Sequence, residues 1–406
     1  MSCAARRRES DRKGKDNMAH RLEQVKTSFF GKGAIRLIIP QLQKMHAARA
    51  LIVTDRFLYD SGAAKRVGDV LLEAGVSYAV YYNVKPNPSI DVVNECIRAA
   101  RSLQIDLLIA LGGGSAIDTA KAASIVMTNG GSVEMYEGVD KSSRPGIPII
   151  AVNTTAGTGS ECSAFYIVTD PVRKSKMSMV DNNCMVTIAV NDTDFMSSMP
   201  EKLTASTGVD ALTHAIEALF SMNANPLTDK DAAWAVSVIM EFLPRAFADG
   251  KDEEARSMMA YAEYVAGNAF SNAGLGMVHA MAHALGGHYS LPHGVCNAVL
   301  LPYVLAFDMG FGEGLERFPK VALAMGLPVS LGYVRAAQDV IAHVQNLLRT
   351  VQIPVKLSEL KGVDTRDFPK LAELAMHDSC MKTNPFQPTL QQVIAVYSSA
   401  YSGLPD

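Results

Sequence analysis

Histidines and an aspartate in the second half of the chain are the residues best suited to chemistry. Five of the nine histidines fall between positions 214 and 293, namely His214, His279, His283, His288 and His293. Asp210 and His214 stand four residues apart in a stretch of helical pattern, and His279 and His283 repeat that spacing. Each pair therefore shares one helix face. His293 follows at a predicted helix start.

One carboxylate with three neutral imidazoles suits a divalent ion such as iron or zinc. The six cysteines are scattered and form no CxxC pair, which argues against a structural zinc site held by thiolates. A single histidine on an apolar helix face is usually a hydrogen-bonded core residue, but five in one segment favour a metal site. The sequence therefore predicts a metal centre in this part of the chain.

A glycine-rich turn in the first half is a candidate phosphate-binding loop. The apolar run 107–111 leads into Gly112, Gly113, Gly114 and Ser115, and a helix is predicted from position 116 onward. Glycines let the backbone approach a phosphate, and free N–H groups at a helix start attract anions. The loop departs from the usual Rossmann fingerprint, because Ile117 stands where a third glycine is expected. Asp118 is a candidate cofactor contact or, alternatively, a first-turn carboxylate that complements the helix dipole.

Two further strand ends support a nucleotide cleft. The polar loop 153–161, NTTAGTGSE, follows the next predicted strand, and Asp55 ends an earlier one. Glycine-rich loops at the carboxyl ends of neighbouring parallel strands form a crevice suited to a dinucleotide. A carboxylate at Asp55 can accept hydrogen bonds from a ribose and disfavours a 2′-phosphate, although aspartate is also a common turn residue. We therefore expect NAD rather than NADP.

The elements that must position these residues fall into two halves. Strand-like runs at 50–54, 78–82, 107–111 and 147–152 alternate with helical stretches at 63–74 and 92–103. This pattern favours an α/β amino-terminal domain with a Rossmann-like parallel sheet covered on both faces. After about Pro200, helical patterns take over at 229–247, 253–272 and 333–351. We expect a dinucleotide-binding α/β domain over 18–199 and an all-helical metal-binding domain over 200–406.

Composition excludes several classes of protein. Of 406 residues, 48% are hydrophobic and 19% charged, which is typical of a globular enzyme. The net charge of −3 and the lack of a basic stripe argue against a nucleic-acid partner, and no apolar run is long enough for a membrane span. The scattered cysteines favour a reducing compartment, so we expect a cytoplasmic protein. Residues 1–17 are polar and basic, and we expect them to be a disordered leader.

The motifs together resemble one known family, the iron-containing (group III) alcohol dehydrogenases, which include 1,3-propanediol, lactaldehyde and NAD-dependent methanol dehydrogenases. The resemblance runs from about Phe29 to Tyr401. It is carried by GGGSAIDTAK (112–121), NTTAGTGSE (153–161), TGVDALTHAIEA (207–218), GLGMVHAMAHALGGHYSLPHG (274–294) and Asn384-Pro385.

The resemblance implies an active site in the cleft between the two domains. It implies one divalent metal, with Fe²⁺ the expected ion and Zn²⁺ the alternative, held by Asp210, His214, His279 and His293. It implies NAD contacts from Asp55, Asn87, Gly113, Gly114, Ser115, Asp118, Thr154, Thr155, Thr158 and Lys176. His283 would face the cleft as the catalytic proton relay or, alternatively, would only hydrogen-bond there. The implied reaction is hydride transfer between a small primary alcohol, or its aldehyde, and NAD, in a homo-oligomer.

At two places the sequence differs from the family pattern, and two other functions are compatible with the fold. Relatives usually carry Asp-Pro where this chain has Asn191-Asp192. They often carry an aromatic or bulky residue at the position of His288, and this histidine could either alter the substrate pocket or simply face solvent. The first alternative is a lyase related to dehydroquinate synthase, but the stretch 209–294 has few of the basic residues that a phosphorylated acid would need. The second is a binding protein that has lost catalytic activity. Such a protein would lack some of the metal-binding residues, whereas all four candidate positions are filled in this sequence. The native alcohol is left open.

Overall fold

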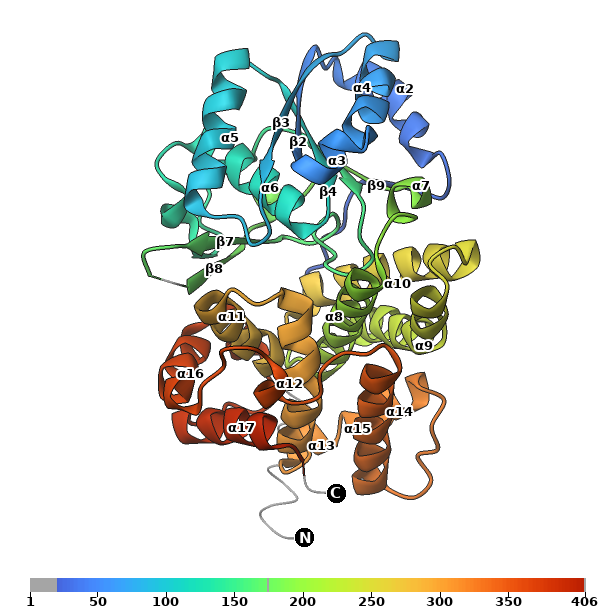
Figure 1. Cartoon of the computed structure of the whole chain (residues 1–406), viewed down its shortest axis with the longest axis vertical. Helices are drawn as coiled ribbons and strands as arrows, with labels where there is room; N and C mark the ends of the chain where they lie inside the picture. The colour runs from blue at the N-terminus through green and yellow to red at the C-terminus, as the bar shows by residue number, and fades with distance from the viewer. Residues whose placement is uncertain (1–19, 174, 405–406) are drawn as a thin grey trace.

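Two structural halves form one elongated molecule in a computed structural model, which describes residues 20–173 and 175–404. Figure 1 shows the α/β half at one end and the helical half at the other, with a small sheet containing β7 and β8 between them. The expected leader, 1–17, lies outside the described residues. The last strand ends at Asn191 and the next long helix begins at Glu201, so we propose the domain boundary at 199/200.

A six-stranded parallel sheet organises the first half, as the sequence predicted. Its strands run in the order β1-β9-β6-β4-β2-β3. Their bounds are β1 Thr27–Phe30, β2 Arg49–Asp55, β3 Ser77–Val84, β4 Leu107–Gly112, β6 Ile149–Asn153 and β9 Ile188–Asn191. The strand order reverses between β2 and β4, which is where open α/β sheets bind ligands at the carboxyl ends of their strands.

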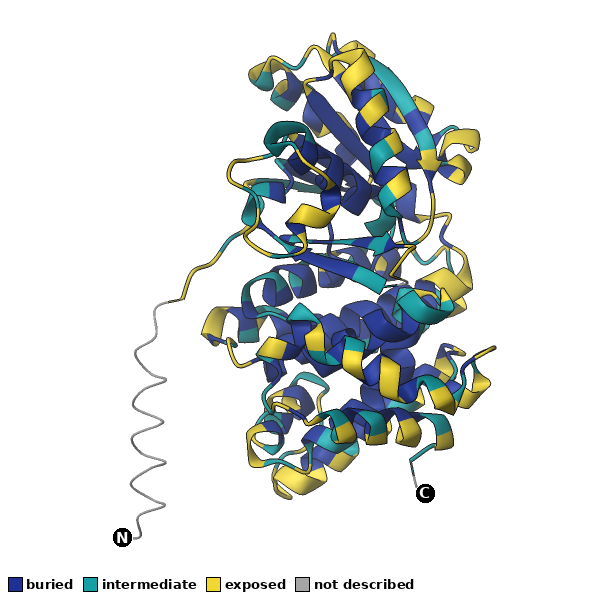
Figure 2. Ribbon diagram, turned by 90° about the vertical axis from the view of Figure 1, so that its left-hand side faces the viewer, coloured by how far each residue is buried: buried dark blue, intermediate teal, exposed yellow. Residues whose placement is uncertain are grey.

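Helices cover both faces of this sheet. On one face α5 (Ile90–Leu103) and α6 (Gly114–Asn129) close an apolar cluster, and on the other face α2 (Ile39–Met45) and α4 (Ala63–Glu73) close a second. Burial on both sides explains why the central strands are continuous apolar runs. Figure 2 shows these strands in the colour of buried residues. The expected helices 63–74 and 92–103 are confirmed to within two residues.

The sequence analysis missed a second, three-stranded sheet. Its order is β5-β8-β7, with β5 Gly138–Val139, β7 Phe165–Asp170 and β8 Ser175–Val180. β7 and β8 form an antiparallel hairpin. In β8, SKMSMV, polar and apolar residues alternate only from Lys176 to Met179, which is the shortest run that indicates a strand. This hairpin places Lys176 next to the helical half, since β8 contacts α11.

Helices alone build the second half, as expected. The long ones are α8 Glu201–Phe220, α9 Pro226–Ala248, α10 Glu253–Ala273, α11 Met277–Tyr289, α12 His293–Asp308, α15 Tyr333–Thr350, α16 Phe368–His377 and α17 Leu390–Ser402. Shorter helices of this half are α13 Gly312–Leu315 and α14 Phe318–Ala324, whereas the short helices α3 Arg56–Asp60 and α7 Thr193–Met196 belong to the first half. The 3₁₀ turns of the first half are η1 Ala34–Ile38, η2 Val133–Tyr136 and η3 Asn182–Cys184, and those of the second half are η4 Leu357–Glu359, η5 Thr365–Asp367 and η6 Ser379–Thr383.

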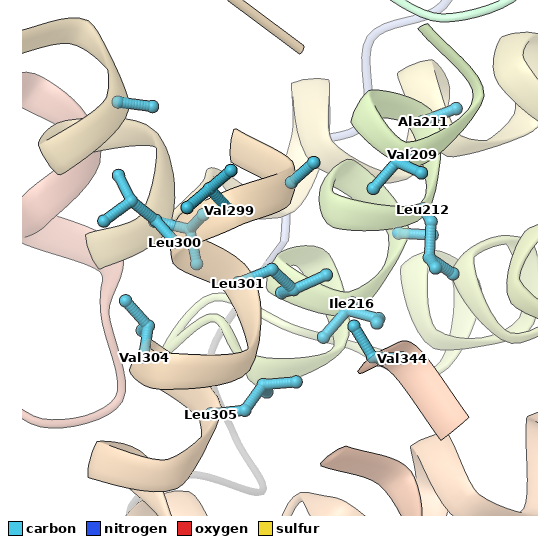
Figure 3. Close-up of a cluster of buried hydrophobic side chains, with 14 of the residues drawn as sticks. Val209, Ala211, Leu212, Ile216, Val299, Leu300, Leu301, Val304, Leu305 and Val344 are labelled. Carbon is cyan, nitrogen blue, oxygen red and sulfur yellow. The ribbon is translucent and has the colours of Figure 1, made fainter. Parts of the chain in front are cut away.

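Helix α8 is the centre of this half. Every residue from position 204 to 220 is buried, and the helix packs against α9, α10 and α12. Figure 3 shows Ile216 of α8 near Leu301 and Leu305 of α12, with Val344 of α15 alongside. The polar side chains of a helix that is buried on all sides cannot hydrogen-bond to water, so each needs a hydrogen-bond partner inside the protein.

The described residues contain free cysteines and no single helix suited to a membrane. Over 20–173 and 175–404, no single helix has the length and hydropathy to cross a bilayer; only the combined length of α12 His293–Asp308 and the segment Gly312–Ala324 would suffice, and these two are bent by 112° relative to each other. Five cysteines of these ranges, Cys96, Cys162, Cys184, Cys296 and Cys380, are buried free thiols.

Candidate metal centre and nucleotide cleft

Three helices bring three of the four expected metal ligands together. Asp210 comes from α8, His279 from α11 and His293 from the first residue of α12, and their ligand atoms all lie within 4.8 Å of one another. Asp210 Oδ1 is 3.8 Å from His279 Nε2 and 3.7 Å from His293 Nε2. These separations are those of donor atoms around a single cation rather than of hydrogen-bonded pairs.

His214, the fourth expected ligand, lies beside this cluster. Its ring stacks on His279 with 4.6 Å between the ring centroids. Its Nδ1 lies 3.2 Å from the backbone oxygen of Gly157 and can donate to it. With Nδ1 as the donor, Nε2 is the ring nitrogen left for a metal.

The donor set fits a divalent cation. Burial holds the pKa of His214, His279 and His293 well below the ordinary value, so all three imidazoles are neutral, as ligation requires. Burial also raises the pKa of Asp210 to about 7, against a hydrogen bond from Asn297 and the nearby Lys176. A carboxylate taken this far from water needs a positive partner, which a cation would provide.

Asn297 faces the same point. Its amide nitrogen lies 2.6 Å from Asp210 Oδ1, 2.9 Å from His279 Nε2 and 3.1 Å from His293 Nε2. An amide has two hydrogens for these three acceptors, and the buried Nδ1 of His293 has no partner. Such under-satisfied polar groups mark a place where a further ligand is expected.

The start of α12 packs so closely on α8 that only glycine fits at position 294. A methyl group there would lie 2.3 Å from the backbone oxygen of Ser206 and 3.4 Å from Cβ of Asp210. Because backbone atoms cannot rotate away, we expect Gly294→Ala to push α12 off α8 and separate His293 from Asp210. The expected loss is about 1–3 kcal/mol of stability with weaker metal retention, measured by denaturant unfolding and elemental analysis. Gly312→Ala, whose methyl group meets nothing within 4 Å, is the control; identical behaviour of the two variants would contradict this packing argument.

Two loops at the carboxyl ends of β4 and β6 form the nucleotide side. A Cβ at Gly113 would lie 2.7 Å from the Thr155 side chain, and one at Gly114 would lie 3.0 Å from that of Thr158. Side chains at either glycine would therefore block the approach of the two loops. The cleft is lined on this side by the expected residues Asn87, Gly114, Ser115, Asp118, Thr158 and Lys176, and on the other by Asp210, His214, His279, His283 and His293. Of the other expected cofactor residues, Asp55, Gly113, Thr154 and Thr155 do not line the cleft.

Asp118 and Asp55 differ in what their side chains do. Asp118 is the fifth residue of α6, beyond the first turn, and accepts from the backbone N–H of Ile167 at 3.0 Å. Its alternative interpretation as a first-turn carboxylate is therefore wrong. Burial raises the pKa of Asp118 to about 6, and Lys121 and Lys176 oppose that rise. Asp55 caps α3 by accepting from the N–H of Leu58 at 2.8 Å, which is the turn role that the sequence analysis left open.

His283 lines the cleft, and a carboxylate on the side away from the cleft bonds its ring. Its Nδ1 lies 2.8 Å from Asp378 Oδ2, and its ring stacks 5.2 Å from that of His293. The carboxylate fixes Nδ1 as the donor, which leaves Nε2 toward the cleft. His288 instead pairs with Asp367 at 3.4 Å and does not line the cleft.

Sequence reasoning missed three polar residues that touch the site, namely Glu217, Asn297 and Asp378. Glu217 follows Asp210 and His214 at the next helical turn of α8, and Asn297 is four residues after His293, so both could have been found from spacing. Asp378 lies 95 residues from His283, and no local pattern indicates it. Burial raises the pKa of Glu217 to about 8, and a cation at His279 would favour its ionised form.

Comparisons with known proteins agree with this arrangement along nearly the whole chain. An iron-containing alcohol dehydrogenase family model matches residues 26–193, and the C-terminal model of the Fe-containing alcohol dehydrogenase family matches residues 204–401. Alcohol dehydrogenase 4 of Saccharomyces cerevisiae is 45% identical over 92% of this chain and 96% of its own. The NAD-dependent methanol dehydrogenase of Bacillus methanolicus is 40% identical over 92% and 97%. The crystal structure of a 1,3-propanediol oxidoreductase superposes with a TM-score of 0.90 at 39% identity, over 95% of this chain and 100% of that one.

The fold and site thus define a metal-dependent oxidoreductase built from a parallel sheet domain and a helical domain. The chain belongs to the iron-containing alcohol dehydrogenase family, as its motifs predicted, and acts on small alcohols and aldehydes with NAD. The comparisons favour this activity over the lyase and over a protein without chemistry.

Proposed function

We propose that the chain transfers a hydride between a small primary alcohol and NAD at one divalent ion held by Asp210, His214, His279 and His293. One observation carries this proposal: the converging ligand atoms of Asp210, His279 and His293 and the glycine loop after β4 line the same cleft. A metal and a dinucleotide bound on opposite walls of this cleft would leave room for a small substrate between them.

Each part of the cleft has a proposed role. The ion would supply a Lewis acid for the oxygen of the alcohol or aldehyde. Phe165, Phe270 and Leu275 line the cleft and would exclude water around the carbon that exchanges the hydride. His283, oriented by Asp378, would accept or return the hydroxyl proton at its Nε2.

The cofactor side is proposed in the same terms. N–H groups of Gly113, Gly114 and Ser115 at the start of α6 would bind the pyrophosphate, and Asp118, Asn87 and Lys176 would lie along the nicotinamide half. Thr158 of the adjoining loop completes this wall, and Thr154 and Thr155, which precede it in the same loop but do not line the cleft, are proposed as further contacts on the nicotinamide side. Asp55 at the end of β2 is the proposed ribose partner, with one oxygen already engaged by α3.

Iron is the proposed ion, with zinc as the alternative, because a mixed set of imidazole and carboxylate donors accepts both. A homo-oligomer in the cytoplasm is also proposed. Strand β1 is the outermost strand of the sheet, with β9 on one side only among the described strands, and such an edge is suited to pairing between copies. Buried free thiols suit a reducing compartment.

Turnover with and without metal tests the proposed function. Anaerobically purified protein, loaded with Fe²⁺ or Zn²⁺, should reduce NAD with linear alcohols of one to six carbons. A chelator should abolish NADH formation, and added metal should restore it. Chelator-insensitive turnover would overturn the metal role, and absence of net NADH with every alcohol would favour the lyase.

A further inference from the structure

Glu217 is a buried carboxylate that lies behind the metal site and outside the cleft. It stands on α8 in the row formed with Asp210 and His214. One oxygen, Oε1, accepts from the backbone N–H of Val278 at 2.8 Å and of His279 at 3.4 Å. The other oxygen, Oε2, contacts Nδ1 of His279. A single side chain therefore bonds both the start of α11 and the ring that α11 contributes to the site.

The bond to Nδ1 decides which nitrogen of His279 can bind a metal. A neutral imidazole carries one hydrogen, and the nitrogen that carries it cannot be a ligand. With the carboxylate as acceptor, the hydrogen sits on Nδ1 and the lone pair sits on Nε2. The far side of the ring agrees, because the amide nitrogen of Asn297 lies 2.9 Å from Nε2 and faces it as a donor. Both neighbours thus favour the tautomer that leaves Nε2 free.

We propose that Glu217 is a positioning residue of the metal site, which holds His279 in the metal-binding tautomer and orientation through Nδ1. This inference rests on the proposed function, because it assumes that His279 is a ligand. The carboxylate–histidine pair raises the basicity of the ligand and fixes its ring. Glu217 does not line the cleft in which substrate and cofactor would bind, so its effect on turnover would pass through the metal.

Glu217→Gln separates this role from a purely structural one. The amide oxygen must face the N–H groups of Val278 and His279, because an NH₂ group there would oppose two donors. The NH₂ group then faces Nδ1 of His279 and donates to it. That bond selects the hydrogen on Nε2, which blocks ligation, while the start of α11 stays satisfied. The variant therefore preserves the fold and reverses the tautomer.

Metal affinity of the whole protein is the measurement. Metal-free wild type, Glu217→Gln and Asp308→Asn are titrated with Zn²⁺ and with Co²⁺ against a chromogenic chelator, and their metal-free melting temperatures are recorded. Asp308 is the matched control, since it is a buried carboxyl in the same small cavity as Glu217 that touches none of the four proposed ligands. We expect Glu217→Gln to bind both ions about 10- to 100-fold more weakly, with an altered Co²⁺ absorption spectrum at saturation and an unchanged metal-free melting temperature. Asp308→Asn should keep the wild-type affinity.

Each other outcome counts against a specific claim. Wild-type affinity in Glu217→Gln overturns the positioning role, while the metal site itself stands. Weaker binding with a lowered metal-free melting temperature, or an equal loss in Asp308→Asn, assigns Glu217 a structural role and overturns the inference as well. Failure of the wild type to bind either ion overturns the proposed metal centre, which is a separate result.

Discussion

His279→Ala is expected to lose both metal retention and alcohol oxidation. The ring lies in the middle of the cluster, stacked on His214 and 3.8 Å from Asp210 Oδ1, and its loss leaves two of the three converging donors. Removing an outer partner of a ligand costs about 10- to 100-fold in affinity or activity, and removing the ligand itself should cost more. His293→Ala should behave alike. The measurements are metal content after anaerobic purification and the rate of NADH formation with added metal.

A third histidine supplies the control for these two variants. His288 lies on the same helix as His279, but pairs with Asp367 away from the cleft. His288→Ala should therefore keep its metal and its turnover. Full activity in His279→Ala or His293→Ala would refute the ligand assignment, and loss of metal in His288→Ala would show that the effect comes from general damage to α11.

Glu263→Gln is expected to stabilise the protein at pH 8. Glu263 of α10 and Glu161 of the loop after β6 are both fully buried and lie close enough to shift each other's pKa. Among the described residues, neither oxygen of Glu161 nor Oε2 of Glu263 has another hydrogen-bond partner, so we expect the two carboxyl groups to hydrogen-bond to each other. Two carboxylates cannot donate, so this bond requires a shared proton. Burial and the neighbouring acid hold the pKa of Glu263 well above its ordinary value. In Glu263→Gln the amide oxygen still accepts from the N–H of Gly159, and the NH₂ group donates to Glu161 without any proton uptake.

The direction of the pH effect follows from proton counting. Because the folded-state pKa lies above the ordinary value of 4.5, the native protein binds more protons than the unfolded chain from about pH 4.5 up to that raised value. Wild-type stability therefore falls as pH rises through this window, by up to about 1.4 kcal/mol per pH unit for each retained proton. The glutamine variant should show a flatter profile, with a gain of about 1–3 kcal/mol at pH 8.

Denaturant unfolding between pH 5 and pH 8 measures this difference. Glu241→Gln, a change at an exposed position of α9, should keep the wild-type profile. A parallel shift of the Glu263→Gln curve at all pH values, or destabilisation at pH 8, would mean that the two acids do not share a proton.

The sequence predicted those helices and strands whose hydrophobic pattern is unambiguous. Strand β4 and its neighbours are buried on both faces, so their apolar runs are unambiguous, and α15 shows its buried face as a regular helical repeat. The hairpin of β7 and β8 packs one face in an apolar cluster, but its other face lines the cleft with apolar and polar residues mixed, namely Phe165, Ile167, Thr169 and Lys176. This mixture hides the alternation that would predict a strand. Lys176, which the hairpin carries, was found only through family resemblance.

The site was predictable to the extent that its residues share a helix. Asp210 with His214, and His279 with His283, are one turn apart, so their common faces follow from spacing. The partners that lie on a different helix or turn cannot be predicted from spacing. Asp378 reaches His283 from a distant 3₁₀ turn, and Asn297 meets Asp210 only because α12 packs on α8. Tertiary packing, which local sequence does not encode, sets these contacts.

The proposed metal ligands lie on three separate helices, α8, α11 and α12, and this arrangement would affect the stability of the protein in the cell. A cation gripped by three separate helices acts as a removable cross-link, comparable to a disulfide in tying distant stretches of chain together. Cells short of the ion would then hold a molecule whose helical half opens more readily, while the sheet half keeps its own core. Supply of the ion would thus govern how long each copy survives as well as whether it works.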